Sequence, residues 1–204
     1  MNQIEGFVLN GGMSSRMGTA KGSLEIGGHT LAEYAANALL AVCDRVYLVG
    51  GSQTVTGVET LPDVTWNGPA AKASILGLRS AFLHCSTKYA AVLSCDMPLV
   101  TGKVFERMAA ETGLLENGQA DVIVPSDHNG WLQPLCAVYE RDRSRRVIEE
   151  YLDAGELQLR GFVGRLQTYV VEAASFADLE RADYFFMNIN TPEDLAEAVR
   201  KLDE

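Results

Sequence analysis

The stretch LNGGMSSRMGTAK, residues 9–21, follows an apolar run, IEGFV, that has the composition of a buried strand. It holds three glycines, two serines, an arginine and a lysine, more special residues than a plain turn requires. Glycines let the backbone come close to a ligand, and their N–H groups can then surround phosphate oxygens. Because Arg16 and Lys21 add positive charge, the loop predicts a phosphate-binding site directly after the first strand.

The spacing of this loop differs from that of two common phosphate-binding motifs. Lys21 lacks the flanking glycine and serine or threonine of a Walker loop, and the glycines do not form GxGxxG. A surface loop with solvated charges is the alternative interpretation. The position directly after a strand favours phosphate binding.

Composition limits what the chain can be. It has 204 residues, of which 47% are hydrophobic, so we expect one domain over residues 1–204 with a sizeable core. The net charge of -10 argues against binding to nucleic acid or to acidic membranes, which needs broad positive surface. We expect no signal peptide and no membrane-spanning segment. The cysteines form no CxxC pair and indicate reduced, mostly buried thiols in a cytoplasmic protein; they are Cys43, Cys85, Cys95 and Cys136.

Strand-like and helix-like segments alternate along the chain, which predicts an α/β fold with a largely parallel sheet and helices on both faces. The strands are expected at 4–10, 45–51, within 55–63, and at 89–98, 120–125, 131–139 and 166–173. The helices are expected at 30–43, 73–85, 103–113, 144–156 and 191–202.

Polar motifs are expected at the ends of strands, where ligands bind in sheets of this kind. They are LNGG at 9–12, SCD at 94–96 and MNIN at 187–190. Asp96 follows an apolar run, and a carboxylate there is costly unless it is paired or binds a metal. It is therefore either a Mg²⁺ ligand that bridges nucleotide phosphates or a turn residue before Pro98.

The stretch MNINTPEDL, residues 187–195, combines two asparagines with a helix start. Thr191, Pro192 and Asp194 have the pattern of a capped first turn. Asn188 and Asn190 lie on one side of an extended segment, because their spacing is two residues. A helix start alone would explain the stretch from Thr191 onward but not the asparagines.

The motifs LNGGMSSRMGTAK, SCDMP, QPLCAVY and NINTPEDL together resemble those of the molybdenum cofactor guanylyltransferases, the MobA-type nucleotidyltransferases. The order and spacing hold from Ile4 to Leu195. The resemblance implies a three-layer, Rossmann-like α/β fold with a mixed, mostly parallel sheet. It also implies transfer of GMP from GTP to Mo-molybdopterin, with Mg²⁺ as cofactor and pyrophosphate as the second product. Other proteins of molybdenum cofactor biosynthesis, or acceptor proteins, are further expected partners.

The resemblance also assigns roles to individual residues. Those expected to bind the nucleotide are Leu9, Asn10, Gly11, Gly12, Lys21, Asp63 near the guanine, and Asp96 through the metal. Asn188 and Asn190 match the closing motif, near the second substrate or the metal. Trp66 and Trp131 could line a pterin or base pocket, because flat rings stack well, although contacts with the core or a partner would equally explain them.

The expected chemistry needs positive charge more than a general base. Both reactants are anionic and the attacking phosphate is already ionised, so catalysis is chiefly positioning and charge neutralisation. Arg16, Lys21 and a metal held by Asp96 form the expected catalytic set. The three histidines are expected to be structural or exposed, and they are His29, His84 and His128.

Three alternatives stay open. Cytidylyl transfer from CTP to the same cofactor is one, although Gly12 and the CDMP motif at 95–98 favour the guanylyl branch. A sugar-phosphate nucleotidyltransferase is the second. A non-catalytic nucleotide-binding accessory protein is the third, and it draws on Ala73 and Ser74, which stand where the family usually has Gly-Pro.

Overall fold

A seven-stranded sheet forms the centre of the protein in the computed structural model, which describes residues 4–11, 21–51, 53–68 and 73–203. The strand order is β5-β4-β1-β6-β8-β7-β9, and β8 runs antiparallel to its neighbours while the other pairs are parallel. The strands are β1 (Ile4–Leu9), β4 (Arg45–Val49), β5 (Glu59–Leu61), β6 (Tyr89–Ser94), β7 (Val122–Pro125), β8 (Cys136–Glu140) and β9 (Thr168–Val171).

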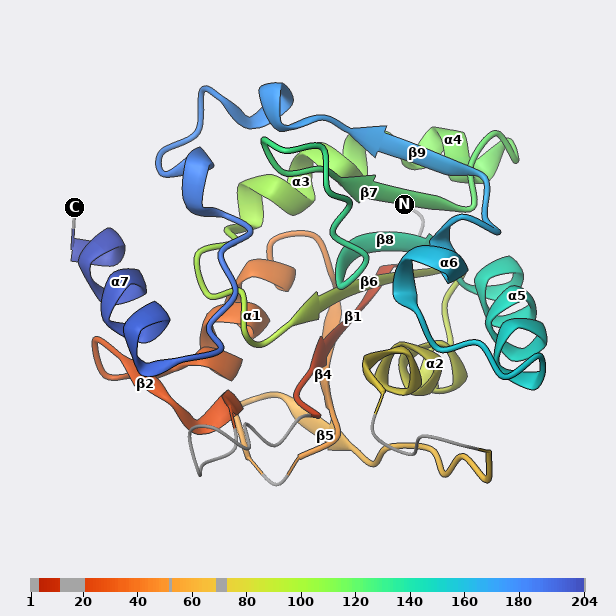
Figure 1. Cartoon of the computed structure of the whole chain (residues 1–204), viewed down its shortest axis with the longest axis horizontal. Helices are drawn as coiled ribbons and strands as arrows, with labels where there is room; N and C mark the ends of the chain where they lie inside the picture. The colour runs from red at the N-terminus through yellow and green to blue at the C-terminus, as the bar shows by residue number, and fades with distance from the viewer. Residues whose placement is uncertain (1–3, 12–20, 52, 69–72, 204) are drawn as a thin grey trace.

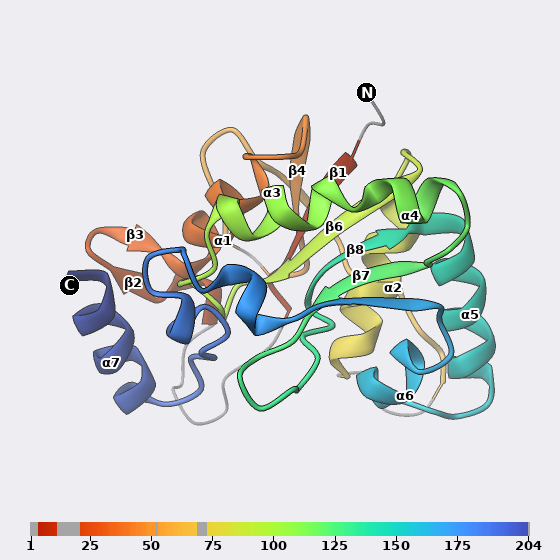
Figure 2. The ribbon, with the colours of Figure 1, turned by 90° about the horizontal axis from the view of Figure 1, so that it is seen from above.

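Helices cover both faces of this sheet, as Figures 1 and 2 show. One face packs against α1 and α3, and the other packs against α2, α5 and α6. The predicted α/β fold with a mixed, mostly parallel sheet is therefore confirmed. The helices are α1 (Leu31–Leu39), α2 (Ser74–His84), α3 (Gly102–Ala110), α4 (Thr112–Glu116), α5 (Arg141–Asp153), α6 (Leu159–Val163) and α7 (Pro192–Asp203). None of these described helices has both the length and the apolar character that crossing a bilayer requires.

The two central strands, β1 and β6, set the position of the functional motifs. Every residue of both strands is buried, as expected for strands covered by helices on both faces. They pair in parallel so that Leu9 lies opposite Ser94, and the N–H of Cys95 donates to the Leu9 carbonyl at 3.2 Å. The segments that begin at Asn10 and at Cys95 therefore leave the sheet side by side.

Several short elements were not predicted from the sequence. A hairpin of β2 (Glu25–Ile26) and β3 (His29–Thr30) turns through Gly27 and Gly28, both at positive φ. Its strands are too short to show a period of two residues. Helix α6 and three short 3-10 helices were also missed, and the latter are η1 (Lys21–Ser23), η2 (Ala173–Phe176) and η3 (Ala182–Tyr184).

Two predicted boundaries were wrong. Gly113 was expected to end the helix at 103–113, but α3 ends at Ala110 and Gly113 lies inside the next short helix, α4. The strand expected at 131–139 begins only at Cys136, because residues 126–135 form a loop held by its own hydrogen bonds.

Candidate active site

The predicted polar motifs meet at one edge of the sheet. Strands β1, β4, β5 and β6 are parallel, so their carboxyl ends lie at the same edge, and β7 and β9 end there too. The segment after η3 also returns to this edge, where the N–H of Ile189 donates to the Asp96 carbonyl at 2.8 Å. Ile189 is fully buried beside α7 and the β2–β3 hairpin, which fixes the closing motif in place.

Lys21, Asp96 and Asn190 form the centre of the site. The Lys21 Nζ lies 3.0 Å from Asp96 Oδ2 and 2.6 Å from Asn190 Oδ1. The side chains of Lys21 and Asp96 are each 18% exposed, so the ion pair is partly shielded from water but can still be reached from outside. The structure thus brings together three predicted residues from the first, middle and last motifs.

Asp96 has one oxygen left for another ligand. Its Oδ1 is buried and has no hydrogen-bond partner among the described residues, while Oδ2 is held by Lys21. A buried carboxylate oxygen without a partner is costly, and a hard cation is a suitable partner for it. No group of three or more His, Cys, Asp or Glu side chains that could hold a metal occurs in the described part of the chain. A Mg²⁺ here would therefore depend on Asp96 together with substrate phosphates and water, as this ion commonly does.

The helix start after Asn190 holds that residue in position. The Asp194 carboxylate accepts from the N–H groups of Asn190 and Thr191 at 2.8 and 2.9 Å, and Thr191 Oγ1 accepts from the N–H of Asp194. These bonds, led by that from Asn190, hold the pKa of Asp194 below its usual value. The predicted capping pattern is therefore present. Asn188 does not join the cluster through any described contact, because its Nδ2 donates to the Phe186 carbonyl at 3.1 Å.

Asp63 lies beside the start of the glycine loop. A Cβ built on Gly11 would lie 3.4 Å from Asp63 Oδ2, and one built on Gly50 would lie only 2.5 Å from the same atom. Gly50 follows β4 with φ of 74°, a conformation that glycine adopts readily, and its missing side chain leaves the space that the Asp63 carboxylate occupies. Sequence reasoning missed this role of Gly50, although the position directly after a strand was a signal for it.

Leu9 and Asn10 are buried, so their side chains are not the open part of the loop. Asn10 donates to Gln53 Oε1 at 2.7 Å, and a Cβ on Gly22 would overlap its Oδ1. The exposed backbone of Gly11 is what this segment offers to a ligand. The predicted residues Gly12 and Arg16 lie outside the described residues.

No catalytic role for histidine or cysteine emerges at the centre of the site. His84 lies 2.9 Å from the Pro62 carbonyl, while His29 and His128 lie beside Glu33 and Asp183. Burial raises the pKa of Cys95 to about 12, so this neighbour of Asp96 stays a neutral thiol. Its role is packing.

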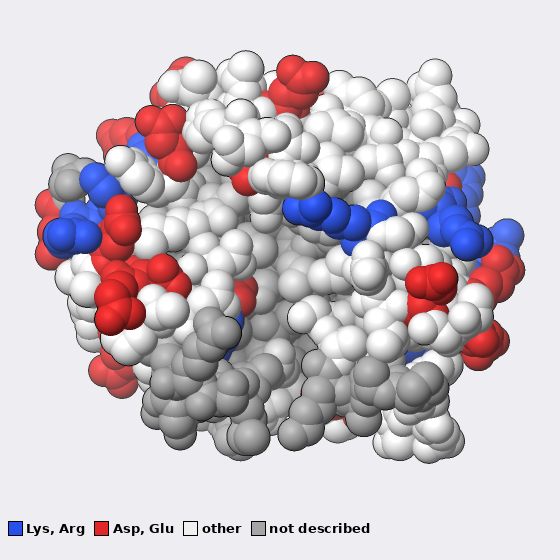
Figure 3. Space-filling model, viewed as in Figure 1, with Lys and Arg blue, Asp and Glu red and all other residues white. Residues whose placement is uncertain are grey.

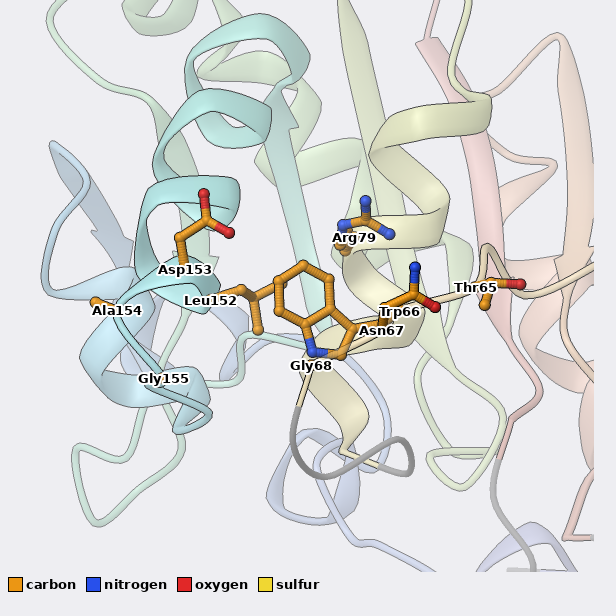
Figure 4. Close-up of a pocket in the computed structure, with 9 residues that line it drawn as sticks. All are labelled: Thr65, Trp66, Asn67, Gly68, Arg79, Leu152, Asp153, Ala154 and Gly155. Carbon is orange, nitrogen blue, oxygen red and sulfur yellow. The ribbon is translucent and has the colours of Figure 1, made fainter.

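A pocket between α2 and the end of α5 lies apart from this centre (Figure 4). Trp66 lines this pocket, and the guanidinium carbon of Arg79 lies 5.3 Å from the centre of its indole ring. Arg79 also pairs with Glu149 at 2.8 Å and is 13% exposed. Of the residues that line the pocket, only Trp66 was a candidate from the sequence, and none belongs to the predicted nucleotide or metal site. In this structure Trp66 packs between α2 and the end of α5.

The comparisons with known proteins agree with this geometry. Residues 6–169 match the family model of the MobA-like NTP transferase domain. A protein of Pelotomaculum thermopropionicum named "Probable molybdenum cofactor guanylyltransferase" is 31% identical over 97% of this chain and 93% of its own length. A protein of Nostoc with the same name is 29% identical over 96% of this chain and 90% of its own length.

Solved structures show the same fold. A molybdopterin-guanine dinucleotide biosynthesis protein A from Archaeoglobus fulgidus superposes with a TM-score of 0.77 at 22% identity, over 98% of both chains. A 2-C-methyl-D-erythritol 4-phosphate cytidylyltransferase from Thermus thermophilus superposes with a TM-score of 0.66 at 15% identity, over 97% of this chain and 98% of its own. Since the family model spans most of the chain and the Pelotomaculum relative matches nearly all of it, the chain belongs to the MobA-like NTP transferase family of nucleotidyltransferases.

Proposed function

We propose that the chain transfers GMP from GTP to Mo-molybdopterin, forming molybdopterin guanine dinucleotide and pyrophosphate. The names of the relatives suggest this pair of substrates. The observation that carries the proposal is the meeting of Lys21, Asp96 and Asn190 at the carboxyl edge of the sheet. This is the place where a nucleotide phosphate binds in folds of this kind.

The reaction needs a site that holds two anions together. The terminal phosphate oxygen of the acceptor attacks the α-phosphorus of GTP, a new P–O bond forms, and the bond to the bridging oxygen of pyrophosphate breaks. Lys21 carries one positive charge and three N–H donors, and since two of the donors bond Asp96 and Asn190, one is left for these phosphates. Asn190 and Asp96 fix the position of the Lys21 ammonium group, so this group does not have to move into place during the reaction.

The residues present fit a Mg²⁺ ion as cofactor. The buried Asp96 Oδ1 would hold it, and the rest of its coordination would come from phosphate oxygens and water. When bound, Mg²⁺ supplies positive charge against the charge that develops on the leaving pyrophosphate. Lys21 bonds the other oxygen of the same carboxylate, so Asp96 would hold the ion through Oδ1 while it still pairs with Lys21.

Asp63 and the glycine loop are proposed to select the base. Guanine presents the N1–H and the exocyclic amine side by side, and one carboxylate can accept from both. Cytosine lacks this pair of donors, and adenine has an acceptor at N1. Asp63 is exposed and lies beside Gly11, which supports a role for its carboxylate in contacting a base bound next to this segment.

Two wider expectations belong to the same proposal. Residues 1–204 are taken as one nucleotidyltransferase domain, because both faces of one sheet carry the buried core. The four thiols are free and buried, which favours a reducing compartment such as the cytoplasm. Contacts with other proteins of molybdenum cofactor biosynthesis would deliver the acceptor.

Identification of the product tests the reaction. The purified protein is incubated with GTP, Mg²⁺ and molybdopterin, and the product is identified by mass spectrometry, with each component omitted in turn. We expect the dinucleotide only in the complete mixture. A folded protein that binds GTP but forms no dinucleotide would support the accessory-protein alternative.

A further inference from the structure

The loop between β7 and β8 carries an exposed tryptophan at the active-site edge. Trp131 is 51% exposed, a large fraction for this residue type. The loop leaves β7 at the same edge as Asp96 and returns beside it, because the N–H of Ser94 donates to the Leu135 carbonyl at 2.8 Å. Trp131 is therefore on the half of the edge that lies beyond Asp96, away from Asp63 and from Leu9 at the end of β1.

The loop holds Trp131 in a defined position. Asp127 Oδ1 accepts from the N–H groups of Asn129 and Trp131, both at 2.9 Å. The Asp127 N–H donates to the Trp131 carbonyl at 3.0 Å, and Gln133 Nε2 donates to the same carbonyl at 3.1 Å. These bonds fix the backbone that carries the exposed ring before any ligand arrives, which lowers the entropy cost of binding.

Arg160 of α6 covers one face of this ring. Its guanidinium carbon lies 3.8 Å from the centre of the Trp131 indole, the geometry of a stacked cation–π pair. No carboxylate of the described residues lies within salt-bridge distance of Arg160. Since one face of the indole is covered and half of the residue is still exposed, the opposite face is open to solvent.

The second tryptophan offers no comparable platform. Trp66 packs against the apolar cluster of α2 and α5, and its neighbour Arg79 is neutralised by Glu149. Figure 3 shows a hollow near the centre of the viewed side of the molecule, with basic side chains next to it. The β7–β8 loop and α6 lie side by side at this part of the molecule in Figures 1 and 2.

We propose that Trp131 and Arg160 form the platform for the acceptor, on which Trp131 stacks with a flat conjugated heterocycle and Arg160 attracts its anionic group. The inference rests on the proposed function, because that function supplies an acceptor with a pterin ring and a phosphate. The nucleotide occupies the Asp63 half of the edge and the acceptor the Trp131 half. The two phosphates then meet at Lys21 and Asp96.

A titration that needs no turnover tests this platform. The probe is 6-hydroxymethylpterin phosphate, followed by its own fluorescence anisotropy on adding protein. Trp131→Ala is expected to raise the dissociation constant about tenfold, the usual size of a lost ring-on-ring stack, while Trp131→Phe keeps it within about threefold. Trp66→Phe is the matched control and is expected to bind the probe like the native protein.

Charge is tested in the same way. Arg160→Gln is expected to weaken binding of the probe and to reduce its dependence on salt, because ions screen exposed charges. Arg146→Gln, an exposed arginine on α5, is the control and should change neither. GTP affinity in Mg²⁺ should be unchanged in all of these variants.

The outcomes separate the inference from the proposed reaction. The inference is overturned if the native protein does not bind the probe or if Trp131→Ala binds it normally. It is also overturned if Trp131→Ala weakens the binding of GTP as much as the binding of the probe, since the ring would then contact the nucleotide. Trp131-dependent binding of the probe without any GTP turnover would reject the proposed reaction and keep the platform.

Discussion

Lys21 and Asp96 are 75 residues apart in the chain, yet Lys21 Nζ lies 3.0 Å from Asp96 Oδ2. The pair joins the glycine loop to the end of the central strand β6. It leaves the ammonium group partly exposed and the second carboxylate oxygen unpartnered among the described residues. An anion that enters this edge therefore meets a positioned positive charge and a free metal ligand together.

Removing the Lys21 charge should slow the reaction and leave the fold intact. Lys21→Ala is expected to lower kcat by about 100-fold, since losing a positioned charge of this kind raises the barrier by about 3 kcal/mol. The measurement is pyrophosphate release at saturating GTP, with circular dichroism to check folding. Lys103→Ala, exposed on α3, is the control. Turnover near the native rate in a folded Lys21→Ala protein would remove this lysine from the mechanism.

Asp96 should couple nucleotide binding to Mg²⁺. Asp96→Asn keeps the shape of the side chain but loses the charge that attracts a hard cation, so GTP affinity should gain little from added Mg²⁺. Calorimetric titration of GTP with and without Mg²⁺ measures this effect. Asp44→Asn, at the opposite edge of the sheet, is the control. If Mg²⁺ increases the GTP affinity of Asp96→Asn as much as that of the native protein, Asp96 does not hold the metal and only pairs with Lys21.

Gly50 should be needed for base selection, whereas Gly57 should not. Both have positive φ, 74° and 79°, so alanine strains the backbone at either position. Only at Gly50 would the new Cβ collide with Asp63, since a Cβ on Gly57 meets nothing within 4 Å. Gly50→Ala is expected to reduce the preference for GTP over CTP, and Gly57→Ala only to lower Tm. If Gly50→Ala prefers GTP over CTP as strongly as Gly57→Ala does, Asp63 does not take part in base selection.

The thiols of the native protein should be unreactive at pH 8. Burial raises the pKa of Cys43 and Cys95 to about 12 and that of Cys85 to about 11, and it also raises the pKa of Cys136. At pH 8, far below these values, the reactive thiolate is almost absent. A chromogenic disulfide reagent should label none of them before unfolding and all four after it. Rapid labelling of the native protein would show that one thiol is accessible.

Local signals in the sequence predicted much of this site. The strand before the glycine loop, the apolar run before Asp96 and the capped start of α7 each follow from neighbouring residues, and the structure confirms all three elements. Their meeting could be expected because parallel strands end at one edge of a sheet.

Other features left no local signal or only a weak one. The hydrogen bond from Ile189 to the Asp96 carbonyl and the stack of Arg160 on Trp131 arise only when the sheet and helices are assembled. The β2–β3 hairpin is too short for a hydrophobic period, although the Gly27-Gly28 pair indicated a turn. The first of these contacts holds the segment that carries Asn190 at the predicted phosphate site, and the second forms the proposed acceptor platform.

Base selection tests the central claim most directly. Pyrophosphate release is measured with molybdopterin, Mg²⁺ and either GTP, CTP or ATP, for the native protein and for Asp63→Asn. We predict that the native protein uses GTP. We also predict that Asp63→Asn loses about 1–3 kcal/mol of that preference for each guanine donor left unpaired. A native protein that prefers CTP would contradict the assignment as a guanylyltransferase.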